Sequence, residues 1–231
     1  MEPETAYDER LADWFANHAS TSPYNAFIDR PSMLGLIGDC AGQRVLDVGC
    51  GAGHYAESLL QRGASVVGID GSSALLAHAA QRLDGRAELR AHDLERPLTF
   101  AADASFDGAV MALVLHHVED RPQLLRELAR VLRPGGWLAL SGIHPTADWR
   151  YIGDSYFATG RATLPVADSQ FNIHCWRLSL EQLMTEVLGA GFVLERLVEP
   201  RPLAEYAAID PERYERLMKE PSTLALRLRR P

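Results

Sequence analysis

Residues 45–56 read VLDVGCGAGHYA, and this stretch decides the fold. Its mostly apolar first residues predict a buried strand, its three alternating glycines predict a tight turn, and the residues from His54 onward predict a helix. Glycine adopts positive φ angles and lets the backbone come close to a ligand. The glycine turn, residues 49–53, therefore predicts a binding site for a nucleotide-like molecule.

Short apolar runs alternate with helical patterns along the chain on both sides of this turn. Asp120 and Pro122 are suited to begin the clearest of the helices. Continuous apolar strands that alternate with helices predict a mainly parallel α/β sheet covered on both faces, and ligands bind such sheets at the carboxyl ends of the strands. We expect strands near 45–48, 66–69, 87–91, 106–115 and 137–140, and helices near 53–62, 72–83 and 119–132.

The segments outside this alternating region have patterns of their own. Helical spacing of apolar residues covers 7–15 and 27–37, six aromatic residues gather in 149–176, and an alternating strand ends the chain at 224–228. A helix from about 179 to 188 and a strand to Val198 precede that last strand. We predict one domain over 1–231, with an N-terminal helical cap (1–40), a binding core (41–142), an inserted lid (143–178) and a C-terminal completion of the sheet (179–231).

Composition limits the classes of partner. The 231 residues carry 23 Lys and Arg against 31 Asp and Glu, a net charge of −8, so no basic stripe is available for nucleic acid or an anionic membrane. We interpret Arg227, Arg229 and Arg230 as a solvated strand end. The three cysteines show no C-x-x-C pairing, which disfavours a disulfide framework or a zinc site. Without an apolar run of about 20 residues or a leader-like N-terminus, we expect a cytoplasmic protein.

Two cofactor classes compete for the glycine turn. A dinucleotide fingerprint requires a further glycine where this chain has His54. Asp47 ends the preceding strand, and a carboxylate there repels a pyrophosphate but attracts an ammonium, directly or through water. S-adenosylmethionine carries an ammonium and no phosphate, so the turn favours it over NAD.

Acidic residues also follow the next two predicted strands. Asp70 can accept hydrogen bonds from both ribose hydroxyls, whereas Asp93 can accept from the adenine amine while Leu94 packs on the ring. Taken singly, each acid is equally compatible with a helix cap or a turn. Three acids at the ends of successive strands together predict a nucleoside site.

Further blocks make the sequence similar to a known family. Residues 106–110 read FDGAV, 115–118 read LHHV and 130–136 read RVLRPGG. With the glycine turn and the two later acids, they resemble the class I S-adenosylmethionine-dependent methyltransferases, in the ubiquinone/menaquinone-methyltransferase-like branch. The resemblance implies a Rossmann-like three-layer sandwich. Its sheet would have seven mostly parallel strands with an antiparallel last strand, accompanied by N-terminal helices and an inserted lid.

The resemblance also implies site residues and a cofactor, S-adenosylmethionine, which leaves as S-adenosylhomocysteine. The glycines would line the methionine moiety, the two later acids would hold the nucleoside, the backbone after the fourth strand would face the amino acid end, and a tyrosine would close over the cofactor. These residues are Asp47, Gly49, Gly51, Gly53, Asp70, Gly71, Asp93, Leu94, Met111, Ala112 and Tyr24.

Methyl transfer from a sulfonium needs alignment and exclusion of water, and it needs a base only when the nucleophile arrives protonated. The candidate bases are His116, His117 and His144, which follow the fourth and fifth strands. Because adjacent residues point in different directions, we expect at most one of the first two to face the pocket. Packing or capping is the competing interpretation for each, and we expect no metal site.

The acceptor is predicted largely by exclusion. Residues 111–114 read MALV, without the Asn/Asp-Pro-Pro-aromatic tetrad of nucleic-acid amino-methyltransferases and without an acid for a metal. We predict a methyltransferase for a small, partly apolar molecule under an aromatic lid, with oxygen, nitrogen and carbon all open as acceptor atoms, in a monomer or homodimer. The aromatic residues are equally compatible with an ordinary lid core that packs away from the ligand. The alternatives are a non-catalytic S-adenosylmethionine-binding module, a NAD-dependent oxidoreductase, or a fold that uses the cofactor without methyl transfer.

Overall fold

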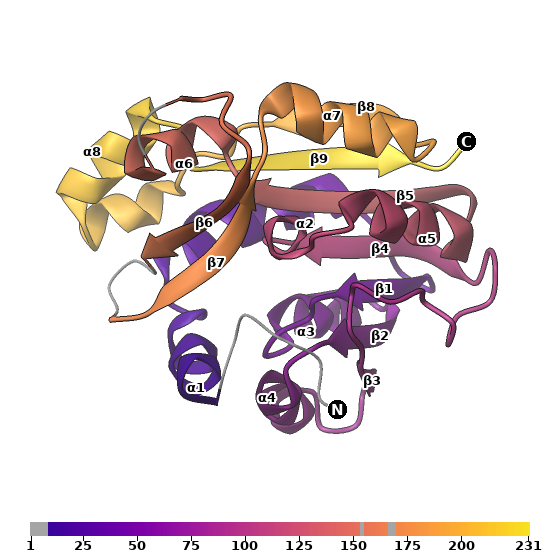
Figure 1. The fold of residues 1–231 in the computed structure, drawn as a ribbon. Coiled ribbons are helices and arrows are strands. Elements are labelled where there is room, and N and C mark those ends of the chain that lie inside the picture. Colours follow the sequence, from indigo (N-terminus) through magenta and orange to yellow (C-terminus); the bar gives the residue numbers. More distant parts are fainter. Residues whose placement is uncertain (1–8, 153–154, 166–169) are drawn as a thin grey trace.

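The main sheet has seven strands, and the computed structural model describes residues 9–152, 155–165 and 170–231. The strands are β1 (Arg44–Val48), β2 (Ser65–Asp70), β3 (Glu88–Ala91), β4 (Phe106–Ala112), β5 (Leu132–Ile143), β8 (Val193–Val198) and β9 (Thr223–Arg229). Their order is β3-β2-β1-β4-β5-β9-β8 (Figure 1). The first five are parallel, and β9 is antiparallel to both of its neighbours, which confirms the predicted topology.

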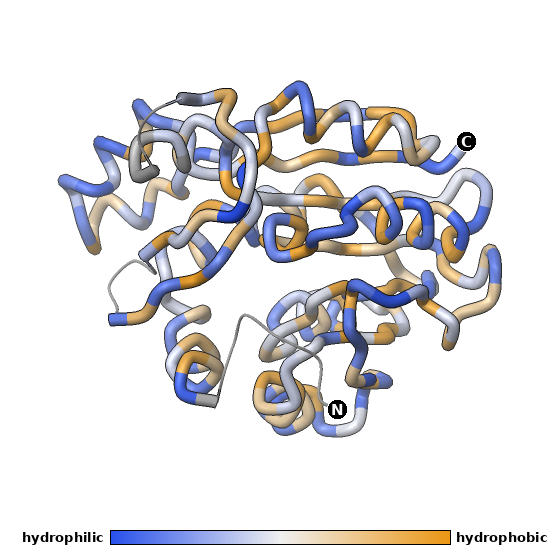
Figure 2. Tube along the Cα trace, in the orientation of Figure 1, coloured by the Kyte–Doolittle hydropathy of each residue, from blue (hydrophilic) through white to orange (hydrophobic). Residues whose placement is uncertain are grey.

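Helices cover both faces of this sheet. The helices α2 (Arg30–Ile37), α3 (His54–Gln61) and α4 (Ser73–Leu83) share one buried apolar cluster with it, whereas α5 (Arg121–Val131) and α7 (Leu180–Gly189) share the other. Figure 2 shows mostly hydrophobic colours along the strands in the middle of the sheet. The helices expected at 53–62, 72–83 and 119–132 are confirmed, and Asp120 caps α5 through the backbone N–H of Gln123.

The fourth strand is shorter than the sequence predicts. It ends at Ala112 rather than near 115, because Leu113 has a φ of 58° and its N–H donates to the carbonyl of Ser141. The chain then forms a short 3₁₀-helix, η2 (Leu115–His117). The side chains of Leu115, His116 and His117 therefore do not alternate as those of a continuing strand would.

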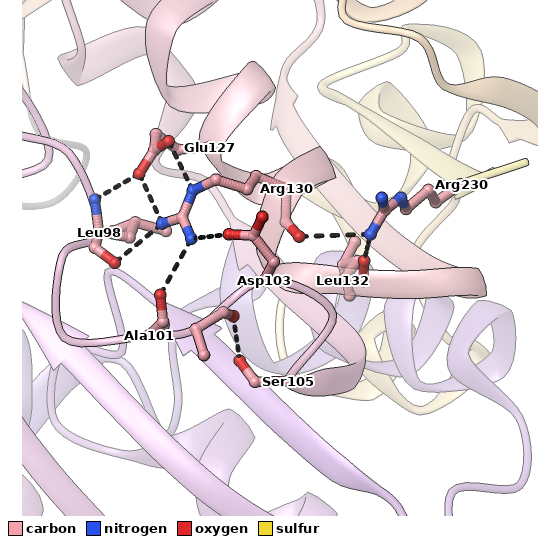
Figure 3. Close-up of polar contacts among 9 residues, drawn as sticks. Leu98, Ala101, Asp103, Ser105, Glu127, Arg130, Leu132 and Arg230 are labelled. Carbon is pink, nitrogen blue, oxygen red and sulfur yellow. Dashed lines mark hydrogen bonds and ion pairs between the residues drawn. The ribbon is translucent and has the colours of Figure 1, made fainter.

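The connection between β3 and β4 is held by one arginine of α5. The Arg130 guanidinium bonds the carbonyls of Leu98 and Ala101 and pairs with Asp103 and Glu127 (Figure 3). Such a cluster replaces the helix that usually crosses between parallel strands. It fixes the chain at residues 98–103, just before β4 begins.

Smaller elements gather at the carboxyl ends of β1 and β4 (Figure 1). They are α1 (Glu9–His18), the π-helical η1 (Pro23–Asp29), α6 (Pro145–Ile152), the antiparallel hairpin of β6 (Gly160–Pro165) and β7 (Asn172–Arg177), η3 (Ala204–Ala208) and α8 (Pro211–Lys219). Tyr7, the first residue of the predicted N-terminal helix, lies outside the described residues, as do 153–154 and 166–169 of the predicted lid. The ligand edge of the sheet is therefore roofed by segments from both ends of the chain.

The interpretation of the C-terminal arginines as a solvated strand end is wrong for Arg227. Its guanidinium donates to the carbonyls of Leu36 and Ile37 at 2.9 and 2.8 Å and lies over the ring of Trp137. The side chain thus satisfies carbonyls at the end of α2, which a helix cannot satisfy by itself. Within the part of the chain that the structure describes, no helix is long and apolar enough to cross a membrane.

Candidate functional site

A cavity of about 500 Å³ opens at the carboxyl ends of the central strands. Its walls come from the glycine turn after β1, the loops after β2, β3 and β4, and the roof formed by η1, α6, the β6–β7 hairpin and α8. Such a crevice is where open α/β sheets bind ligands. The residues that line it decide which ligand fits.

The glycine turn brings backbone to the wall of this cavity. Gly49 and Gly51 line it with φ angles of 67° and 53°, a region that favours glycine. A Cβ at Gly49 would lie 2.4 Å from a methyl carbon of Val114, whereas a Cβ at Gly51 would meet no described heavy atom within 4 Å. Gly53 instead caps α3, and a Cβ there would press on Leu83 of α4. Two of the three predicted glycines therefore face the ligand space and the third packs helices.

Asp47 lies behind the turn rather than in the cavity wall. Its side chain is 2% exposed and accepts the backbone N–H of Ala56 in the first turn of α3. Burial raises the pKa of this carboxyl to about 7. The other carboxylate oxygen, Oδ2, has no hydrogen-bond partner among the described residues. The structure thus gives Asp47 a capping contact and leaves one acceptor unused beneath the turn.

Asp70 connects the end of β2 to the glycine turn. Its Oδ2 accepts the N–H of Gly51 and its Oδ1 accepts the N–H of Ser72, both at 2.8 Å, and the adjacent Gly71 also lines the cavity. Burial raises the pKa of this carboxyl, while these backbone hydrogen bonds oppose the rise. A carboxylate offers about four lone-pair sites, so acceptor capacity remains for hydroxyl groups of a ligand.

The other predicted nucleoside residues also line the cavity. Asp93 accepts the N–H of Glu95 at 3.0 Å in a turn after β3, and Leu94 contributes an apolar side chain beside it. After β4, Ala112 lines the cavity, whereas the Met111 side chain is fully buried in the core. The roof contributes Tyr24 from η1, as predicted.

Both adjacent histidines line the cavity, so the expectation that at most one would face it is wrong. Side chains alternate in a strand, but His116 and His117 belong to the 3₁₀ turn η2, and their ring centroids lie 4.2 Å apart. Burial lowers the pKa of His117 to about 4 and that of His116 well below its usual range. Two neutral imidazoles therefore form one wall of the cavity.

The lid fixes the tautomer of His117. Its Nδ1 lies 3.2 Å from the carbonyl oxygen of His174 on β7. A carbonyl only accepts, so Nδ1 carries the proton and Nε2 carries the lone pair. The Nδ1 atom of His116 is buried and has no hydrogen-bond partner among the described residues.

His144 is not brought to this wall. Its Nδ1 lies 2.7 Å from the hydroxyl of Thr146 and its Nε2 lies 3.1 Å from a carboxylate oxygen of Glu199. Its neighbours Ile143 and Thr146 line the cavity, but the imidazole itself is not among the lining groups. The packing interpretation describes its contacts. No group of three or more metal-ligating side chains occurs in the described ranges.

The lid presents aliphatic rather than aromatic side chains to the cavity. Leu164, Pro165 and Ile173 come from the hairpin, and Ala147 comes from α6. The aromatic residues of the segment whose side chains are described do not line the cavity, and Trp149 and Phe157 are 44% and 74% exposed. Tyr151 belongs to the residues whose side chains are not described. Among the lid residues whose side chains are described, the cavity therefore meets aliphatic side chains in place of the predicted aromatic ones.

Sequence reasoning missed a polar group beside the glycine turn. Arg30 lines the cavity, and its Nη2 donates to the carbonyl of Ala19 while its Nε has no partner among the described residues. The preceding Asp29 is 1% exposed and accepts a 2.5 Å hydrogen bond from the hydroxyl of Tyr55 on α3. The only signal in the sequence was an Asp-Arg pair within an otherwise apolar helical pattern. Burial lowers the pKa of Arg30, as expected for a cation that is held partly out of water.

Residues 46–140 match a family model described as a methyltransferase domain. Among curated proteins, the ubiquinone biosynthesis O-methyltransferase of Paracidovorax citrulli is 36% identical over 124 residues, which are 51% of this chain and 52% of that protein. That of Xanthomonas oryzae is 40% identical over 113 residues, 47% of this chain and 46% of that protein. The chain spans about half the length of the curated relatives that it matches.

A solved structure is similar over nearly the whole chain. An S-adenosylmethionine-dependent methyltransferase from Mesorhizobium loti has a TM-score of 0.72 at 24% identity, and the match covers 92% of this chain and all of that one. At this identity the likeness establishes the fold.

Proposed function

We propose that this chain, whose residues 46–140 match a family model described as a methyltransferase domain, is a class I S-adenosylmethionine-dependent methyltransferase that transfers a methyl group to a small molecule. The observation that carries the proposal is that one cavity has two chemically different walls. One wall holds the glycine turn and the Asp70 carboxylate, and the other holds two neutral imidazoles under an aliphatic lid. The first wall suits the cofactor and the second suits an acceptor.

The residues present fit S-adenosylmethionine part by part. We assign Asp70, beside Gly71, to the ribose hydroxyls and Asp93 with Leu94 to adenine, as the sequence predicts. Gly49, Gly51 and Ala112 would hold the methionine portion, and Tyr24 would cover it. When bound, the cofactor supplies an electrophilic methyl group on a sulfonium.

We add Arg30 to this assignment. Asp29 is engaged with Tyr55, so the guanidinium beside the glycine turn retains a cationic charge toward the cavity. A carboxylate bound to a guanidinium gains a charge-assisted hydrogen bond. We therefore assign the carboxylate of the cofactor's amino acid end to Arg30.

The position of Asp47 argues against a dinucleotide. NAD places its pyrophosphate at a helix N-terminus after the glycine turn, where free backbone N–H groups attract anions. In this chain the Asp47 carboxyl already accepts the Ala56 N–H in that first turn of α3. A pyrophosphate there would compete with a carboxyl group for the same donors.

His117 is the group that we assign to proton removal. Its lone pair is on Nε2, because the His174 carbonyl binds the Nδ1 proton, and its pKa of about 4 keeps it neutral near pH 7. An acceptor that arrives protonated, at oxygen, nitrogen or carbon, would lose its proton to this imidazole. Exclusion of water by Leu164, Pro165 and Ile173 would protect the reacting groups.

The test is thermal unfolding of the full chain with S-adenosylhomocysteine, S-adenosylmethionine or NADH. A ligand at one hundred times its dissociation constant adds about 2.7 kcal/mol of stability. We expect stabilisation by the first two alone, followed by methyl transfer to members of a panel of small phenols, amines and carbon acids. A shift with NADH alone would overturn the proposal. Stabilisation without turnover on the panel would favour a non-catalytic S-adenosylmethionine-binding module.

A further inference from the structure

The two edges of the main sheet differ in character. Edge strand β3 is four residues long and carries charged Glu88 and Arg90. Edge strand β8 reads VLERLV, and most of its residues are exposed, including Val193 (41%), Leu194 (36%) and Leu197 (42%). Short, charged edges resist pairing with other strands, whereas longer apolar edges invite it. The second edge is therefore the one suited to an interface.

The sequence of β8 reads as a mirror about its centre in residue type. Valine stands at both ends, leucine stands inside each valine, and Glu195 and Arg196 occupy the middle. When two copies of such a strand pair antiparallel about a two-fold axis at that centre, valine meets valine and leucine meets leucine. Each Glu195 then meets Arg196 of the second copy.

A regular strand could not use this symmetry. Leu194 and Leu197 are an odd number of residues apart, so they would point to opposite faces of the sheet. In β8 the register shifts between Leu194 and Arg196, with the result that Leu194 lies opposite Leu228 of β9 and Leu197 lies opposite Leu226. This bulge places both β8 leucines on one face, which is what pairing in the mirrored register requires.

The same bulge places the two valines together on the other face. Val193 lies opposite Arg229 and Val198 lies opposite Ala225, two β9 residues that share a face. Leu188, which is 47% exposed, lies one residue before the end of α7, the helix that covers the leucine face of this sheet. A second copy would therefore find apolar side chains on both faces of the edge.

Charge favours a second copy over an unrelated partner. Glu195 lies 3.0 Å from Arg229 and 3.5 Å from Arg227 of its own chain. For Arg196, however, no ion-pair partner occurs within 9–152, 155–165 or 170–231. In the mirrored register, Arg196 of each copy faces Glu195 of the other copy. The contact therefore occurs twice, once on each side of the axis, as in every isologous interface.

We propose that this protein forms a two-fold symmetric homodimer through antiparallel pairing of β8 with β8 of a second copy, Leu194 facing Leu197. The main sheets of the two copies then continue into each other. Light scattering on a sizing column should give twice the chain mass of 25.5 kDa. Arg196→Glu, which places two carboxylates opposite each other, should halve that mass while leaving the melting temperature and S-adenosylhomocysteine binding near those of the wild type.

A cysteine experiment tests the register itself. Paired residues in antiparallel strands have Cα atoms about 4.5–5.5 Å apart, within the range for a disulfide. The double variant Leu194→Cys/Leu197→Cys should therefore form a covalent dimer on mild oxidation. Each single variant should not, because the bulge leaves its two cysteines about two residue spacings, roughly 7 Å, apart along the strands in addition to the gap between the strands. The native Cys40, Cys50 and Cys175 are buried, so they contribute no background.

Ile209→Lys is the matched control, since Ile209 is a 64% exposed apolar residue outside β8. It should leave the dimer intact. A wild type of monomer mass would overturn the proposal. The proposal would also be wrong if the wild type is a dimer, Arg196→Glu does not dissociate it, and the double cysteine variant forms no cross-link.

Discussion

Asp70 has the clearest functional geometry of any single residue in the chain. Its carboxylate holds the glycine turn through Gly51 and lines the cavity at the same time. In Asp70→Asn the charge is lost while size is kept, and hydrogen bonds to a charged group are worth about 1.5–3 kcal/mol. We expect affinity for S-adenosylhomocysteine to fall roughly 10- to 150-fold, as measured by isothermal titration calorimetry.

Asp84→Asn is the control for that measurement. Asp84 is exposed at the C-terminal end of α4 with a φ of 47°, a conformation that asparagine tolerates. Asp84→Asn should bind S-adenosylhomocysteine with the affinity of the wild type. Equal affinity of Asp70→Asn and the wild type would remove Asp70 from the ribose site.

The histidines make a second prediction at the scale of residues. His117 lines the cavity with its lone pair on Nε2, whereas His144 is engaged by Thr146 and Glu199. With an acceptor from the panel, His117→Asn should lower kcat by about 10²–10⁴-fold, the usual contribution of a general base. His144→Asn should leave kcat near that of the wild type.

Neither histidine variant should change binding of S-adenosylhomocysteine, which separates proton transfer from cofactor binding. Because the pKa of His117 is about 4, the neutral base is present throughout the neutral range. The wild-type rate should therefore show no inflection near the ordinary histidine pKa of 6.5. Equal rates for the two variants would contradict the role of His117.

At the scale of elements, a buried polar pair joins the N-terminal cap to α3. Asp29 ends η1, and the hydroxyl of Tyr55 donates to its carboxylate at 2.5 Å. In Tyr55→Phe a buried carboxylate loses this donor, which generally destabilises a protein by about 1–3 kcal/mol. We expect a loss of that size in the free energy of unfolding, measured with urea.

Tyr214→Phe provides the comparison for that loss. Tyr214 is only partly buried, and its hydroxyl makes no hydrogen bond to any residue that the structure describes. Its free energy of unfolding should lie within about 0.5 kcal/mol of that of the wild type. A Tyr55→Phe variant as stable as Tyr214→Phe would show that the Asp29 contact does not secure the cap.

For the whole molecule, buried titrating groups make stability depend on pH. Burial lowers the pKa of His54 and His117 to about 4 and holds that of His116 well below its usual range. As pH falls from 6.5 toward 4, the unfolded chain binds protons that the folded chain does not, so the free energy of unfolding decreases. Burial also lowers the pKa of His144, which adds to this loss. Asp29, Asp47 and Asp70 act oppositely, because burial raises their pKa values above the ordinary 3.8. With four histidines against three aspartates, we expect a net loss of stability in acid.

Melting temperatures between about pH 7 and about pH 5 test this balance. The wild type should lose stability over that interval. His117→Asn should lose less, because one acid-labile group is gone. Asp47→Asn should lose more, because the opposing group is gone. Identical pH dependence in all three proteins would mean that these two pKa shifts are absent from the folded state.

Much of the fold follows from local pattern. Burial on both faces makes β1, β2 and β4 read as continuous apolar runs, and the alternation at Leu224, Leu226 and Leu228 marks the antiparallel strand. That Asp70 at the end of β2 and Asp93 after β3 line one cavity was predictable as well, since parallel strands end at one edge. Asp47 was predictable as an acid near the end of β1, at the edge where the parallel strands end. Its contact with the first turn of α3 was not predictable.

The sequence by itself therefore determined the sheet, the glycine turn and the cavity wall that carries Asp70 and Asp93, because periodicity and turn chemistry act over a few residues. Only the tertiary structure decided the other wall: that His116 and His117 turn inward together, that Arg30 reaches the cavity, and that the lid presents aliphatic side chains. These depend on a 3₁₀ turn after β4 and on contacts between residues far apart in the chain. No local pattern records which distant segment will pack against a side chain, and that packing decides which groups face the ligand.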